Sequence, residues 1–168
     1  MAGASLLAVD PGLGGGLCFM VDGAIVEVMD VPTLPDGSNR EVDVLAICRR
    51  IDRWKPRHAI IENVQPMPSI PGAGGVRRGM GAASSFRFGF ATGQLRAVVT
   101  CYGMNLRLVH PRTWKKWAGL QGPDKEQSRQ LALQLVPEAA QWLGRKKDHG
   151  RAESVLLALY GKETLGML

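Results

Sequence analysis

Two short apolar runs, each ending in a carboxylate, constrain the fold of this 168-residue chain more than any other feature of its sequence. The run from Leu6 ends at Asp10, and the run from His58 to Ile61 ends at Glu62. The second run does not alternate polar and apolar residues, so a strand built from it must be covered on both faces. We therefore predict a central parallel strand in a sheet that carries helices.

The segment after Asp10 predicts a β-hairpin. Glycines at 12, 14, 15 and 16 turn the chain sharply, and residues 17–21 and 24–31 have the composition of two strands. The dipeptide Asp22-Gly23 between them is a strong two-residue turn signal. Residues 32–38 are then expected to form a loop.

Helical periodicity follows this loop. Ser38 and Glu41 have capping-box spacing, and apolar residues recur on one helical face up to Ile51. The helix is expected to stop before Pro56. Further segments predict a helix capped by Ser84 or Ser85 and running to Cys101, a buried strand at 106–109, short helices opening at Pro111 and Pro123, and a last helix at 151–160.

The order of these elements predicts a single α/β domain over residues 1–168. Three strands, a helix, a strand, a helix, a strand and further helices are expected to form a mixed five-stranded sheet with helices on both faces. A common arrangement places the first strand beside the fourth, in the order 3-2-1-4-5. The carboxyl ends of those two strands then lie side by side, where open sheets bind ligands.

Four carboxylates are expected to converge at this edge of the sheet. Asp10 and Glu62 end the two strands, Asp148 precedes the last helix, and Glu153 lies in its first turns among apolar residues. A carboxylate in such a setting is costly to bury without a compensating charge. Hard oxygen ligands suit Mg²⁺, with Mn²⁺ as a substitute, and four of them suffice for two ions that hydrolyse a phosphodiester.

Other interpretations of the same residues stay open. Asp148 is placed either to cap the helix or to bind metal, and Glu153 either to favour the helix N-terminus or to bind metal. His149 competes with Asp148, as a ligand or general base. The glycine run after Asp10 is not a P-loop, because no Gly-Lys-Ser/Thr follows it, so no nucleotide cofactor is indicated.

Charge and cysteine content narrow the class of partner and the compartment. Lys and Arg exceed Asp and Glu by 21 to 15, and this excess favours a polyanion such as nucleic acid. Three widely spaced cysteines, Cys18, Cys48 and Cys101, indicate a reducing compartment and neither a zinc site nor disulfides. The sequence shows no membrane span and no secretion signal, so we expect a cytoplasmic protein.

Five stretches resemble one enzyme family in order and spacing over nearly the whole chain. They read LLAVDPGLGGGLCFM, AIIENVQPMP, SSFRFGFATGQLRAVV, VHPRTWKKWAGLQGPDKEQSRQLALQLVPE and KKDHGRAESVLLALYG. The chain resembles the RuvC-type Holliday junction resolvases of the RNase H-like superfamily, and is most similar to their phage-borne and plant-organelle branch. One departure is Glu153, since members of this family often carry Asp at that position.

The resemblance implies a structure-specific endonuclease that cuts four-way DNA junctions symmetrically with divalent metal. It implies that Asp10, Glu62, Asp148 and Glu153 hold the metal and that the enzyme is a homodimer. The enzyme is then expected to act in the cytoplasm, in a host cytoplasm if it is phage-borne, or in an organelle if a transit peptide was removed. Phe86, Phe88 and Phe90 are candidates for the dimer surface. Basic residues near the carboxylates are candidate phosphate contacts: Arg77, Arg78, Arg112, Lys115, Lys116, Lys146 and Lys147.

Three other functions are compatible with parts of this sequence. A nuclease of this fold that acts on RNA or RNA–DNA hybrids is not separated from a DNA enzyme by the sequence. A non-catalytic junction-binding module is disfavoured because all four carboxylates are present. A sugar or acetate kinase of the actin-like fold also opens with an Asp and glycines, but it needs two such domains, and 168 residues are too few.

Overall fold

The computed structural model describes residues 4–65, 70–71, 77–78, 81–122 and 124–167. A mixed sheet in the order β3-β2-β1-β6-β9 forms the centre of the molecule. This is the predicted order 3-2-1-4-5, because β6 and β9 are the fourth and fifth strands of that sheet. Its strands are β1 (Ser5–Asp10), β2 (Gly16–Val21), β3 (Ala24–Asp30), β6 (His58–Glu62) and β9 (Asn105–Val109).

The pairing of β1 places two of the predicted carboxylates at one edge of the sheet. β1 is antiparallel to β2 and parallel to β6, with Val9 opposite Ile61. Asp10 and Glu62 are the next residues of the two paired strands. The prediction that the first strand lies beside the fourth is therefore confirmed.

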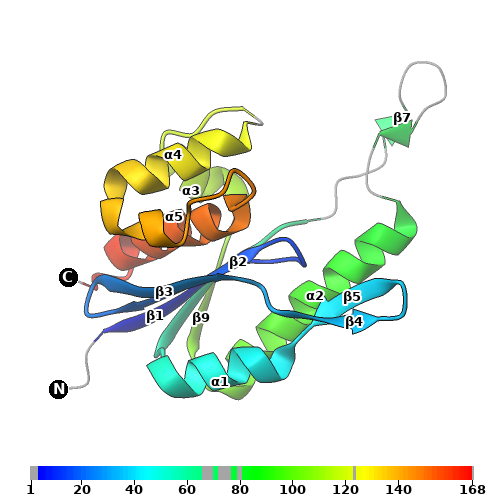
Figure 1. The fold of residues 1–168 in the computed structure, drawn as a ribbon, viewed down its shortest axis with the longest axis horizontal. Coiled ribbons are helices and arrows are strands. Elements are labelled where there is room, and N and C mark those ends of the chain that lie inside the picture. The colour runs from blue at the N-terminus through cyan, green and yellow to red at the C-terminus, as the bar shows by residue number, and fades with distance from the viewer. Residues whose placement is uncertain (1–3, 66–69, 72–76, 79–80, 123, 168) are drawn as a thin grey trace.

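Two layers of helices cover the sheet, one on each face (Figure 1). One layer contains α3 (Pro111–Trp117), α4 (Lys125–Leu135), the 3₁₀ turn η2 (Pro137–Gln141) and α5 (His149–Thr164). The other contains α1 (Val44–Trp54) and α2 (Ala82–Cys101). Because both faces are covered, strands such as β6 are apolar without alternation.

Alternation along the strands decides which face each side chain joins. Leu6, Ala8 and Ile60 belong to the core beneath α4 and α5. Leu7, Val9 and Ile61 belong to the other core, beneath α1 and α2. Asp10 and Glu62 continue the first series, so both carboxylates fall on the face that α5 covers.

The region before α1 differs from the prediction. The expected loop at 32–38 and the capping box of Ser38 and Glu41 are wrong, because a hairpin of β4 (Thr33–Asp36) and β5 (Asn39–Val42) occupies this segment. The cap of α1 is Asp43, whose carboxylate accepts a hydrogen bond from the Ala46 N–H at 2.9 Å. A Ser/Thr-x-x-Glu pattern competes with strand pairing, and here pairing prevails.

The ends of other elements also differ from the prediction. Helix α2 begins at Ala82 after Gly81, without the serine cap expected at Ser84 or Ser85, and α5 starts at His149 and continues to Thr164. Before α2, β7 (Ile70–Pro71) pairs with β8 (Arg77–Arg78) in a small antiparallel sheet. Among the described helices, none combines the length and apolarity that crossing a bilayer requires.

Candidate active site

Three of the four predicted carboxylates meet at the edge of the sheet. One oxygen each from Asp10, Glu62 and Glu153 lies within 4.8 Å of the others. Asp10 and Glu62 come from the ends of adjacent parallel strands, and Glu153 comes from the second turn of α5, which crosses above them. We call these three residues the carboxylate cluster.

Burial and mutual repulsion raise the pKa values of the two strand carboxylates, Asp10 and Glu62. The pKa of Asp10 lies well above its usual value because the carboxyl is buried and because Glu153 and Glu62 add negative charge beside it. Burial also raises the pKa of Glu62, although a hydrogen bond from Trp114 opposes the rise. Such a group of hard oxygen donors fits a divalent cation, whose charge removes the repulsion.

Three neighbours contact the glutamates of the cluster. The buried Trp114 donates its indole N–H to Glu62 Oε1 at 2.9 Å. Lys115 Nζ lies 3.0 Å from Glu153 Oε1, and its charge opposes the rise in the pKa of Asp10 and of Glu62. Ser128 Oγ also donates to Glu153 Oε1, at 3.4 Å. The signal for the role of Trp114 is that a buried indole N–H needs an acceptor.

The structure does not bring Asp148 into the cluster, which therefore holds three carboxylates where four were expected. Asp148 Oδ2 accepts from the Arg145 backbone N–H at 2.8 Å, and Oδ1 lies 2.6 Å from Arg145 Nη2. Burial would raise the pKa of Asp148, but these hydrogen bonds and the charges of Arg151 and Arg145 lower it. Both carboxylate oxygens of Asp148 therefore already have hydrogen-bond partners.

The Asp148 contacts extend across the sheet to β3. Arg151 Nε lies 2.7 Å from Asp30 Oδ1 and its Nη1 donates to the Trp142 carbonyl at 3.0 Å. Arg145 Nη2 also reaches Asp30, at 3.4 Å. This network ties the start of α5 to the end of β3, and sequence reasoning missed it because its partners are 115 or more residues apart.

Glycine residues allow the backbone of α5 to pack close to the strands. A Cβ at Gly150 would lie 2.5 Å from the Gly14 carbonyl oxygen and 2.7 Å from Gly15 C. A Cβ at Gly16 would lie 2.5 Å from the Gly150 carbonyl oxygen. Only glycine permits this approach. The close packing fixes the height of α5 above β1, and therefore the position of Glu153.

His149, the predicted competitor of Asp148, begins α5. Its Nδ1 is buried and, within the part of the chain that the structure describes, has no hydrogen-bond partner. His149 is not part of the cluster.

Four of the seven basic residues predicted to contact DNA are exposed to solvent. Arg112 and Lys116 are exposed on α3, and Lys146 and Lys147 are exposed just before α5. The side chains of Arg77 and Arg78 lie outside the described residues. Sequence reasoning missed Arg40 of β5, which lines a cavity of about 190 Å³ together with Arg145 and Lys147.

Comparison with solved structures identifies the fold, whereas no family model and no curated protein sequence matches the chain. A structure of Thermus thermophilus RuvC has a TM-score of 0.58 at 16% sequence identity, over 97% of either chain. This chain has the RuvC fold. A second T. thermophilus RuvC structure, in complex with a Holliday junction substrate, has a TM-score of 0.57 at 14% identity and the same coverage.

A viral structure shares the RuvC fold with this chain. The fowlpox virus Holliday junction resolvase has a TM-score of 0.52 at 11% identity, over 96% of this chain and 99% of its own. The RNase H-like α/β fold expected from the sequence is thereby confirmed. At these sequence identities the comparison supports the arrangement of helices and strands.

Proposed function

We propose that this protein is a divalent-metal-dependent endonuclease that resolves four-way DNA junctions. The observation that carries the proposal is the carboxylate cluster, in which Asp10, Glu62 and Glu153 meet at the edge of a RuvC-type sheet. Sequence motifs and fold lead independently to the same class of enzyme. The solved structures with this fold include a RuvC bound to a Holliday junction substrate.

The proposed metal is Mg²⁺, with Mn²⁺ as a substitute, held by the three carboxylates of the cluster. Bound divalent metal supplies an activated water and stabilises the charge on the leaving oxygen in phosphodiester hydrolysis. The protein's own part is to hold the ligands. Trp114 fixes the Glu62 carboxylate, and the glycine contacts of α5 set the position of Glu153. Lys115 places a cation where a scissile phosphate would approach the cluster.

The proposed substrate is branched DNA. Exposed cations lie on the segments next to the cluster residues: Arg112 and Lys116 are on α3, which carries the Lys115 that contacts Glu153, and Lys146 and Lys147 come just before α5, which carries Glu153. Such residues position a phosphate backbone without reading its sequence. The three cysteines are unpaired, which agrees with a cytoplasmic location.

We further propose that the enzyme is a homodimer joined through the outer face of α2. Phe86 and Phe90 on this face are 74% and 53% exposed and stack with ring centroids 6.3 Å apart. A Cβ at Gly89 or Gly93 would meet nothing within 4 Å, so another helix can approach closely. A two-fold dimer would present two identical sites to the two strands of a junction. Sedimentation should show a dimer that Phe86→Ser with Phe90→Ser converts to monomer.

The test is cleavage of a four-way junction compared with a linear duplex and an RNA–DNA hybrid. We expect symmetric nicks in the junction with Mg²⁺ or Mn²⁺ and none in EDTA. Asp10→Asn should abolish cleavage and keep junction binding in Ca²⁺, because it removes one ligand charge without changing the side chain's size. The matched control is Asp22→Asn, which alters an exposed carboxylate in the β2–β3 turn.

Two results would contradict the proposal. Full cleavage in EDTA, or by Asp10→Asn, would exclude the metal site. Cleavage of the hybrid but not of the junction would assign the same site to RNA.

A further inference from the structure

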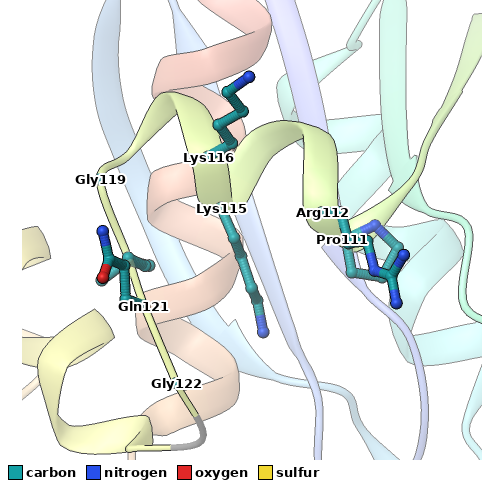
Figure 2. Close-up of a pocket in the computed structure, with 8 residues that line it drawn as sticks. Pro111, Arg112, Lys115, Lys116, Gly119, Gln121 and Gly122 are labelled. Atoms are coloured by element: carbon teal, nitrogen blue, oxygen red, sulfur yellow. The ribbon is translucent and has the colours of Figure 1, made fainter.

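A cavity of about 350 Å³ lies directly beside the carboxylate cluster, between α3 and the turn that follows it. Figure 2 shows Lys115 extending between the Gln121 turn and the Arg112 end of α3, while Lys116 points the other way. We call this the α3 cavity. Lys115 connects this cavity with the cluster, since it lines the cavity and its Nζ atom lies 3.0 Å from Glu153 Oε1.

The charge and chemistry of the lining suit a nucleotide. Arg112, Lys115 and Lys116 supply three cations, and none of the described residues that line the cavity is acidic. Leu120 and Pro111 add apolar surface, and Gln121 adds an amide. A nucleotide has the matching parts: a charged phosphate, an apolar base face and a polar base edge. The volume lies within the usual range of small-ligand sites, about 300–1,000 Å³.

The turn that forms one wall is built to leave this space open. Gly119 and Gly122 have φ values of +68° and +79°, and a Cβ on either would meet no atom within 4 Å. Side chains other than glycine rarely adopt such angles. The wall is therefore bare backbone on both sides of Leu120 and Gln121. The Gln121 amide has no hydrogen-bond partner in the part of the chain that the structure describes.

We propose that the α3 cavity holds the nucleotide adjacent to the scissile phosphate and that Gln121 reads its base. The inference rests on the proposed function and names a specificity site within it. Lys115 and Arg112 hold the phosphate, Leu120 contacts the base face, and the Gln121 amide faces the base edge. A carboxamide pairs in bidentate fashion with adenine, by accepting from N6 and donating to N7. The cavity therefore favours adenine at one position next to the cut.

The test uses junctions in which each base next to the mapped cut site is varied. The wild-type enzyme should cleave junctions with adenine at one flanking position about tenfold faster than those with other bases, as expected for one bidentate contact. Gln121→Ala should reduce this preference to within about twofold and still cleave. The control is Gln134→Ala, an exposed glutamine on α4 that does not line the cavity; it should keep the preference.

A second measurement needs no metal. In EDTA, the wild-type protein should bind a junction with adenine at that position at least about fivefold more tightly than one with an abasic site there, and Gln121→Ala should bind both equally. A preference that survives Gln121→Ala, or no flanking preference at all, would overturn the assignment of the cavity. If the wild-type protein cleaves no junction, the proposed function itself fails, which is a different result.

Discussion

Replacing Gly150 by Ala should separate the placement of α5 from the identity of its catalytic side chain. The new Cβ would lie 2.5 Å from the Gly14 carbonyl oxygen, whereas ordinary contact begins at 3.4 Å, so the helix must retreat by about 0.9 Å. The atoms it meets are all backbone, in Gly14 and Gly15, and cannot rotate away. Overpacking of this kind costs about 1–3 kcal/mol. For a protein of this size, each kcal/mol lowers Tm by about 2–4 °C.

The effect on the metal site should exceed the effect on stability. Glu153 lies one turn after Gly150, so its carboxylate moves with the helix, and metal–ligand distances tolerate only about 0.2 Å. A misplacement near 1 Å costs about 100-fold in rate. We expect Gly150→Ala to remain folded, to bind Mn²⁺ more weakly in a calorimetric titration, and to cleave junctions about 100-fold more slowly.

The control for Gly150→Ala is another glycine close to α5. Gly144→Ala places its Cβ 3.9 Å from the Ala140 carbonyl oxygen, which is ordinary contact, and should leave Mn²⁺ affinity and cleavage unchanged. If Gly150→Ala bound Mn²⁺ with wild-type affinity and cleaved at the wild-type rate, the close backbone contact would not position Glu153.

Three further predictions concern ionisable groups. The raised pKa of Asp10 means that stability without metal falls as pH rises from about 4 through that raised pKa, so in EDTA Asp10→Asn should raise Tm at pH 7 and lose this advantage near pH 4. Asp148→Ala should cost about 1–3 kcal/mol of stability, because it breaks the charged hydrogen bonds from Arg145. His149→Ala should leave Tm and cleavage close to wild type, since His149 is not part of the cluster and its buried Nδ1 has no described partner to lose; loss of cleavage in a folded His149→Ala variant would assign the histidine to the site.

The sequence determined the central strands and the sheet edge at which they end. An apolar run without alternation must be covered on both faces, which requires a sheet between helices. The hairpin signal at Asp22-Gly23 and the order of elements were sufficient to predict the strand order. Asp10 and Glu62 could be paired from the sequence alone, because parallel strands end at the same edge.

The tertiary structure decided which other residues join that pair. Asp148 and Glu153 both lie near the start of α5. The Glu153 carboxylate lies beside the strand carboxylates, whereas the Asp148 carboxylate accepts a hydrogen bond from Arg145. No local pattern distinguishes a metal ligand from an ion-paired cap, because the deciding partners come from distant parts of the chain. Arg145 and Arg151 form ion pairs with Asp148. Asp30 comes near these arginines only when the chain folds.

The face of the sheet that carries the site was likewise determined partly by the sequence and partly by tertiary packing. Alternation along β1 and β6 places Asp10 with Leu6 and Ala8, and Glu62 with Ile60, on a common face, and that much follows from strand periodicity. Which helix covers the face does not follow, because α1, α2 and α5 all present apolar residues. The backbone contacts of Gly16 and Gly150 select α5 for close approach, and this packing brings Glu153 within reach of the two strand carboxylates.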